Sequence, residues 1–137
     1  MKEAIQTLLK SDKMAHAFEY LKQDEAHTID QQIELVQISS FSPFEEKRAI
    51  RFKELLTEAG LDPVMDEVHN VYAHIHGTGI GPTLYVSAHL DTVFPPETPL
   101  PVKREGTKIY APGIGDDTRG LAEILTLARA IKESGLK

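Results

Sequence analysis

The first forty residues repeat apolar positions every three or four residues, which is the period of a helix with one buried face. The positions that show this repeat are Ala15, Phe18, Leu21, Ile29, Ile33 and Val36. The polar residues 23–26 interrupt it, and Asp30 is a candidate N-terminal cap for the helix that follows. We therefore predict a helical lead-in over residues 1–40.

The strongest helix signal comes next. Ser42 is a candidate N-cap, Pro43 suits the first helical position, and Glu45 stands where a capping box places its acid. An apolar stripe then follows one helix face, through Ala49, Phe52, Leu55, Leu56 and Ala59. Gly60 is a natural C-terminal stop, so these signals predict an amphipathic helix from Pro43 to Ala59.

Beyond Gly60 the pattern changes to strands. Residues 71–76 alternate apolar and polar side chains, which indicates a half-buried strand. Residues 83–88 are nearly all apolar, which is typical of a parallel-sheet strand buried on both faces. Residues 102–110 predict a hairpin around Gly106, and an apolar stripe over 121–131 predicts a last helix.

Helices alternating with strands indicate the α/β class. We predict a three-layer αβα sandwich around a mixed, mainly parallel sheet. A length of 137 residues fits one domain, so residues 1–137 are treated as one unit. An α/β fold normally returns to another strand after such a last helix. We therefore expect residues 1–137 to be the truncated N-terminal portion of a larger catalytic domain.

The charge and composition narrow the functional classes. The net charge is −6, and the basic residues form isolated pairs, which argues against a nucleic-acid-binding face. The chain has no cysteine, so a zinc site would have to use histidine and carboxylate ligands. No signal-peptide core and no apolar stretch of membrane-spanning length are present. We expect a cytoplasmic protein without nucleic-acid or membrane partners.

His89 and Asp91 form the first candidate site. Both follow the predicted strand 83–88, and sites in α/β sheets gather outside the carboxyl ends of strands. An extended backbone places both side chains on the same side. A carboxylate beside a metal-bound histidine accepts its second ring N–H and fixes its tautomer. His89 is therefore a candidate zinc ligand, and Asp91 is a candidate orienting residue.

The glycine-rich residues 113–120 supply the second candidate site. Asp116 and Asp117 stand at the start of the predicted last helix, where negative charge is favoured by about 0.3–1 kcal/mol. A dication would offset two adjacent carboxylates better, and one carboxylate can bridge two metals about 3.5–4 Å apart. Helix capping also explains the pair, so spacing alone leaves both interpretations open.

Together the two motifs resemble a known family. The run His-Leu-Asp-Thr-Val at residues 89–93 and the run at residues 110–120 are similar to the paired signature of co-catalytic zinc exopeptidases. This family includes peptidase T, glutamate carboxypeptidase, the aminoacylases and succinyl-diaminopimelate desuccinylase. The resemblance covers roughly residues 30–135. One departure is Thr118-Arg119-Gly120, because many members carry Lys-Gly after the aspartates.

The resemblance implies a role for each matching position. His89 would bind one zinc, Asp91 would orient His89, and Asp116 would bridge two zincs, with Co²⁺ or Mn²⁺ as alternative ions. The peptide between Asp116 and Asp117 would be cis. The implied reaction is hydrolysis of amide bonds in small peptides or N-acyl amino acids.

The family's general-base Glu and remaining zinc ligands follow the second motif and have no counterpart in these 137 residues. We therefore leave open whether the chain is itself an enzyme, and expect it to be inactive alone. An alternative hypothesis is a non-catalytic remnant or split-gene product that acts as a structural or dimerising module, which keeps a homodimer open. A nucleotide-binding α/β domain is disfavoured, because Asp116 and Asp117 would repel phosphate.

Other polar residues are given structural roles. His74 and His76 lie on one face of the predicted strand 71–76 and are expected to face solvent. Glu123 is expected to be a solvated residue of the last helix and not the missing base.

Overall fold

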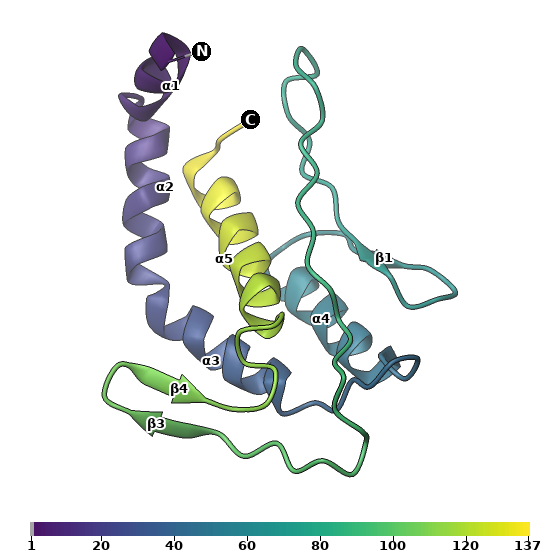
Figure 1. Ribbon diagram of the computed structural model, residues 1–137. Helices are drawn as coiled ribbons and strands as arrows, with labels where there is room; N and C mark the ends of the chain where they lie inside the picture. The colour runs from purple at the N-terminus through teal and green to yellow at the C-terminus, as the bar shows by residue number, and fades with distance from the viewer. Residues whose placement is uncertain (1) are drawn as a thin grey trace.

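The computed structural model describes residues 2–137, and Met1, the first residue of the predicted unit, lies outside them. Helices dominate the described chain, and its strands are short (Figure 1). The helices are α1 (Lys2–Leu9), α2 (Asp12–Gln23), α3 (Glu25–Val36), α4 (Glu46–Glu58) and α5 (Thr118–Ser134). The strands are β1 (Val64–Met65), β2 (Val71–Tyr72), β3 (Lys103–Glu105) and β4 (Lys108–Tyr110).

The predicted helical lead-in is confirmed as α1, α2 and α3. Ser11 caps α2, because its hydroxyl accepts a hydrogen bond from the Met14 N–H at 3.3 Å. Asp24 stands between α2 and α3, inside the polar run that interrupts the sequence pattern. The prediction of Asp30 as a cap is wrong, because Asp30 lies within α3.

α4 begins at Glu46, later than the sequence predicts. The preceding residues form a turn in which the Phe44 N–H donates to the Phe41 carbonyl at 2.6 Å, and the Ser42–Pro43 peptide is cis. Ser42 and Pro43 belong to this turn, so the predicted N-cap and first helical position are wrong. The stop at Gly60 is confirmed, since this residue adopts the left-handed conformation with φ 78°.

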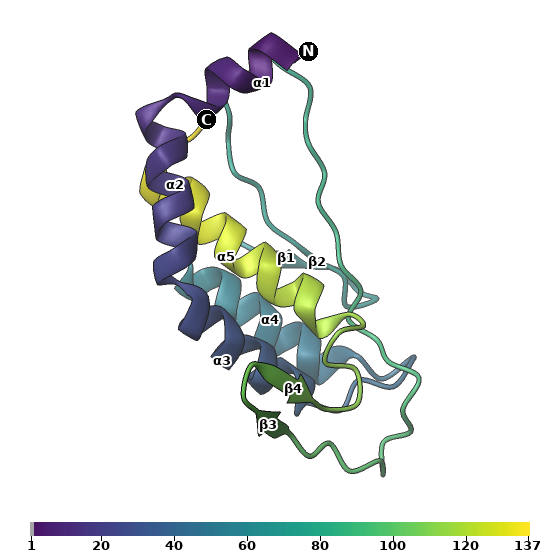
Figure 2. The ribbon, with the colours of Figure 1, turned by 60° about the vertical axis from the view of Figure 1, so that its left-hand side comes forward.

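The apolar stripes of α3, α4 and α5 meet in one core. Its fully buried members are Leu35, Phe52, Leu55, Leu56, Leu121 and Leu125. Figure 2 shows the three helices side by side, with α2 packed along α5. Ala88 and Leu90 are partly buried against this core, so the chain on either side of His89 is attached to the helices.

A buried ion pair joins the junction of α2 and α3 to α5. The Arg129 guanidinium donates to Asp24 Oδ2 from Nε at 3.0 Å and from Nη2 at 2.5 Å. Thr126 donates to the same carboxylate oxygen at 2.7 Å, and Arg129 Nη1 donates to Gln31 Oε1 at 2.8 Å. Every polar group in this cluster therefore has a partner, as burial requires.

The sheets differ from the prediction. The structure combines helices and strands, as the α/β class requires, but its sheets are two antiparallel pairs, β1–β2 and β3–β4. The hairpin predicted around Gly106 is confirmed by β3 and β4. A mainly parallel three-layer sandwich is not formed within residues 2–137.

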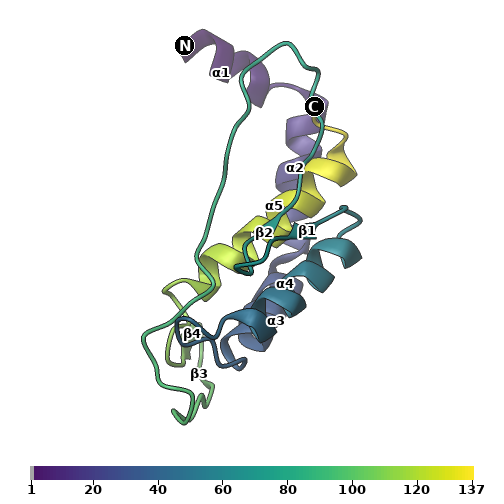
Figure 3. The same cartoon turned by 90° about the vertical axis from the view of Figure 1, so that its right-hand side faces the viewer.

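The predicted buried strand 83–88 is wrong. These residues form no strand, and Leu84, Tyr85 and Val86 are 84%, 73% and 51% exposed. A parallel strand needs neighbouring strands and a helix layer on each face. The described residues supply neither, and residues 74–88 make no backbone hydrogen bond within them. Figures 2 and 3 show this segment as a wide loop, open between its two arms.

The helices show no membrane-spanning character. Within residues 2–137, none combines the length and the apolar composition that crossing a bilayer requires.

Replacing Asp24 with Asn should lower the free energy of unfolding by about 3–5 kcal/mol, because it leaves the buried Arg129 charge without a carboxylate. Urea unfolding measures this loss. Glu19→Gln is the matched control, because Glu19 pairs with Lys22 on the exposed face of α2 and should contribute less than about 1 kcal/mol. An equal loss in both variants would contradict the prediction.

The same ion pair should make stability fall in acid. Burial raises the pKa of Asp24, but the hydrogen bonds from Arg129 and Thr126 and the Arg129 charge outweigh it, so the pKa lies below its usual value. The unfolded chain then binds a proton more readily than the folded chain. The contribution of Asp24 is therefore present at neutral pH and is lost as the pH falls through the acid range. Unfolding measured along this range should show a shallower loss in Asp24→Asn.

Amides of residues 83–88 should exchange with solvent far faster than those in the middle of α5. The amides of residues 83–88 lack backbone partners, whereas those of α5 are held by helical hydrogen bonds in the core. Hydrogen exchange followed by NMR or mass spectrometry gives the comparison. Protection of residues 83–88 equal to that of α5 would mean that this segment is paired in solution.

Candidate metal centre

His89 is held with its ring away from the helical core. Ala88 and Leu90 pack against the core, and alternate residues of an extended chain point to opposite sides. The His89 side chain is accordingly half-exposed. The alternation around His89 thus survives without the predicted strand.

Both ring nitrogens of His89 face oxygen atoms. Nδ1 lies 3.1 Å from the Asp91 carbonyl oxygen and 3.3 Å from Asp91 Oδ1. Nε2 lies 2.9 Å from Asp116 Oδ1. Asp91 therefore contacts Nδ1, and Nε2 is directed at Asp116 of the second motif.

The surroundings of His89 favour its protonated form. Burial lowers the pKa of His89, but the hydrogen bond to Asp116, the Asp91 carbonyl and the negative charges of Asp91 and Asp117 outweigh burial. The pKa of His89 is therefore raised above its usual value. The surroundings of His89 therefore stabilise a positive charge in the metal-free protein. A bound cation would bring a charge of the same sign.

Asp117 joins the two motifs. As the N-cap of α5, it accepts a hydrogen bond from the Gly120 N–H at 3.1 Å through Oδ1. Its other oxygen accepts the His89 backbone N–H at 3.2 Å. The peptide between Asp116 and Asp117 is cis, as the family resemblance implies. One carboxylate thus fixes the start of α5 against the backbone of His89.

Two glycines allow the second motif to fold this way. Gly113 has φ 78°, and an added Cβ would lie 3.4 Å from the Thr92 side chain. A Cβ at Gly120 would overlap Asp117 Oδ1 and would displace the capping carboxylate. Gln32 on α3 fastens the loop, since its side-chain amide donates to the Ile114 carbonyl at 2.6 Å.

The two motifs line one hollow of about 360 Å³. Its lining residues are His89, Asp91, Thr92, Val93, Phe94, Ala111, Gly113, Ile114, Gly115 and Asp116. All the residues that the sequence singles out for metal chemistry, His89, Asp91 and Asp116, therefore lie together.

The donor atoms fit a zinc half-site. Zinc in proteins is held by imidazole nitrogen and carboxylate oxygen, and both types converge at His89 Nε2 and Asp116 Oδ1. Asp117 is committed to backbone N–H groups. Among residues 2–137 no group of three or more His, Cys, Asp or Glu side chains is arranged to hold one ion. His89 and Asp116 would supply two ligands, fewer than a complete zinc site uses.

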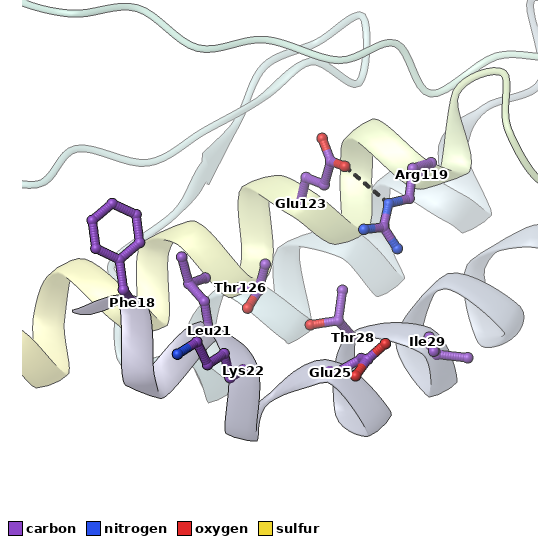
Figure 4. Close-up of a pocket in the computed structure, with 9 residues that line it drawn as sticks. All are labelled: Phe18, Leu21, Lys22, Glu25, Thr28, Ile29, Arg119, Glu123 and Thr126. Carbon is purple, nitrogen blue, oxygen red and sulfur yellow. Dashed lines mark hydrogen bonds and ion pairs between the residues drawn. The ribbon is translucent and has the colours of Figure 1, made fainter. Parts of the chain in front are cut away.

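A second hollow, of about 770 Å³, lies between α2, α3 and α5 (Figure 4). Figure 4 shows Glu123 beside Arg119 on α5, where Arg119 Nε donates to Glu123 Oε1 at 2.9 Å. Glu123 lines this hollow and not the one that contains His89. The interpretation of Glu123 as a helix residue outside the metal centre is therefore supported.

The other histidines singled out in the sequence lie apart from the hollow. His74 and His76 are exposed on the loop after β2, with ring centroids 4.4 Å apart. Their solvent-facing placement is confirmed.

Arg48 is a site neighbour that the sequence motifs do not single out. Its guanidinium donates from Nη1 to the Leu90 carbonyl at 2.9 Å, between His89 and Asp91. A signal exists in the sequence, because Arg48 is four residues before Phe52 and so falls on the apolar stripe of α4. A charged residue on a buried face requires a partner, and the partner here is the site backbone.

Comparison with known sequences agrees with the motifs. Residues 85–137 match the family described as Peptidase family M20/M25/M40. Both motifs of the candidate centre lie inside this segment.

Three relatives extend the comparison. Carboxypeptidase G2 of Pseudomonas sp. (strain RS-16) is 39% identical over 70 residues, which are 50% of this chain and 17% of the relative. A protein of Pyrobaculum aerophilum, named as a candidate hydrolase of LysW-lysine and LysW-ornithine, is 44% identical over 64 residues, which are 47% of this chain and 17% of the relative. The uncharacterized protein YqjE of Bacillus subtilis (strain 168) is 27% identical over 128 residues, which are 83% of this chain and 34% of the relative.

The aligned parts of this chain thus span about a third or less of each relative's length. The family match and the relatives agree with the resemblance carried by the two motifs. Residues 85–137, which carry the His89 and Asp116 motifs, are similar to peptidase family M20/M25/M40.

Proposed function

We propose that the chain contributes half of a two-zinc centre to a metallopeptidase or amidohydrolase. The observation that carries this proposal is the convergence of His89 Nε2 and Asp116 Oδ1 in one hollow, while Asp91 occupies His89 Nδ1. The match of residues 85–137 to a peptidase family supports the hydrolase class. The substrate class is the amide bond of small peptides or N-acyl amino acids, in keeping with a relative named as a carboxypeptidase.

Each residue has a distinct role in this proposal. His89 is a zinc ligand through Nε2, and Asp91 fixes the ring by accepting from Nδ1. Asp116 would hold the metals through both carboxylate oxygens, because its side chain is exposed and only Oδ1 meets His89. When bound, zinc activates water for attack and polarises the amide carbonyl, and Co²⁺ or Mn²⁺ would serve as alternatives.

Catalysis requires more than these residues provide. A complete centre also needs a general base and further ligands beyond His89 and Asp116. We therefore expect the chain alone to bind zinc weakly and not to turn over amide substrates. We also propose that the protein acts in the cytoplasm on small substrates, without nucleic-acid or membrane partners.

Zinc titrated into the metal-free chain should bind weakly, and His89→Ala or Asp116→Ala should abolish that binding, because each removes one of two ligands. Isothermal calorimetry measures the affinity. His74→Ala is the matched control, since it removes an exposed imidazole outside the hollow and should leave the affinity unchanged. Zinc affinity unaffected by His89→Ala and Asp116→Ala would overturn the proposed half-site.

A second candidate function is that of an associating module. The exposed apolar residues Leu84, Tyr85 and Val86 lie in a segment without backbone partners, and such segments template strand pairing between chains. We infer that two copies would pair through residues 83–88.

Val86→Lys should then shift the chain from dimer to monomer in light scattering without changing zinc affinity. A charge directly opposite its own copy is unfavourable in a paired strand. Glu123→Lys, which changes charge on α5 outside this segment, is the control. A monomeric unmodified chain at high concentration would exclude this function.

A further inference from the structure

Arg48 is a buried cation held by backbone carbonyl groups. Its side chain lies on α4 and is 1% exposed. Nε and Nη2 donate to the Ile38 carbonyl at 3.2 and 2.6 Å, and Nη1 donates to the Leu90 carbonyl at 2.9 Å. Within the described residues, no carboxylate forms an ion pair with it.

Burying the Arg48 charge without a carboxylate costs free energy of folding. The presence of Arg48 at this position is explained if its hydrogen bonds have a role. Burial lowers the pKa of Arg48 to about 10, while the negative charge of Asp91 raises it, so the guanidinium is still charged at neutral pH. Burying a charge is expensive, and apolar residues of similar volume commonly replace buried charges without loss of stability. The neighbouring stripe positions on α4 are apolar, so an apolar residue would suit the packing. What only Arg48 supplies is a planar set of donors aimed at two carbonyl groups.

The two carbonyl groups belong to segments that meet at the metal centre. The Leu90 carbonyl lies between His89 and Asp91 and also accepts from the Ser40 hydroxyl at 2.8 Å. The Ser40 carbonyl in turn accepts the Thr92 N–H at 2.7 Å. Arg48 and Ser40 thus fix the peptide groups on both sides of Asp91.

The orientation of His89 depends on this stretch of backbone. His89 Nδ1 is met by the carbonyl and the carboxylate of Asp91. If the peptide that carries the Leu90 carbonyl rotated, both oxygens of Asp91 would move away from the ring. His89 Nε2 would then no longer be aimed at Asp116.

We propose that Arg48 is a positioning residue for the metal centre, which clamps the Leu90 carbonyl to the segment before α4 and so sets the Asp91–His89 pair. The metal part of this inference rests on the proposed function, whereas the clamp itself concerns the metal-free chain. Arg48 touches neither ligand and acts through the backbone between them.

Two measurements on Arg48→Met test the proposal. In the metal-free chain, the Thr92 amide should exchange markedly faster, because the clamp beside it is lost. In calorimetry, zinc affinity should fall about 10- to 100-fold, the usual effect of removing a group that orients a metal ligand. Arg48→Lys should give an intermediate loss, since a single ammonium group cannot reproduce the two-carbonyl fork.

Ala17→Gly is the control, because it destabilises the helical body at a buried position on α2, outside the core that Ala88 and Leu90 contact, without touching either carbonyl. At a temperature where it is folded by circular dichroism, its zinc affinity and its Thr92 exchange relative to the α5 amides should match the unmodified chain. An Arg48→Met chain that behaves like Ala17→Gly in both measurements would overturn the proposal.

A milder variant keeps the test decisive if Arg48→Met does not fold. Ser40→Ala removes the other donor to the Leu90 carbonyl, and we expect a smaller loss of zinc affinity with faster Thr92 exchange. Unchanged exchange in both Ser40→Ala and Arg48→Lys would refute the clamp. If the unmodified chain binds no zinc, the proposed function fails, while the exchange data still decide whether Arg48 fixes this backbone.

Discussion

The contact of Ala88 and Leu90 with the helical core is the interaction on which the candidate centre depends. It holds the chain on both sides of His89 against α3, α4 and α5, although no strand forms there. Hydrophobic contact is not directional, so it sets the depth of this segment but not the orientation of its peptide groups. The directional part comes from hydrogen bonds, in which the Leu90 carbonyl receives both Arg48 and Ser40.

The second motif reaches His89 through its own helix. α5 lies in the core through Leu121 and Leu125, and its N-cap Asp117 extends from that fixed start to the His89 N–H. The same carboxylate satisfies the Gly120 N–H, so helix capping and site assembly are one interaction. Of the two interpretations that spacing leaves open for the aspartates, helix capping is confirmed for Asp117, and metal binding by Asp116 stays a prediction. Asp117 caps the helix, and Asp116 faces the imidazole.

The helical and extended parts of the chain differ in how far their apolar side chains are buried and their polar groups are hydrogen-bonded. The helices bury a continuous core and pair their buried polar groups, as Asp24 and Arg129 show. Residues 74–88 carry apolar side chains and unpaired backbone groups. A strand, unlike a helix, takes its backbone partners from elsewhere in sequence or from another chain. The strand-like sequence of residues 83–88 and their unpaired structure are therefore compatible.

The elements that depend on local interactions could be predicted from the sequence alone. The apolar periods specified the helices, Gly60 and Gly106 specified a stop and a turn, and the two motifs identified His89, Asp91 and Asp116. These features depend on neighbours within a few residues, which is the range over which periodicity and capping act. The start of α4 could not be predicted in this way, because Ser42 and Pro43 serve a turn as readily as a helix start.

The tertiary structure sets which distant groups meet. It brought His89 within 2.9 Å of Asp116, directed Glu123 into a different hollow, and placed the Arg48 guanidinium on the Leu90 carbonyl. It also left residues 83–88 without a sheet. Strand pairing and buried polar contacts depend on partners far away in the chain, and no local pattern records where those partners lie.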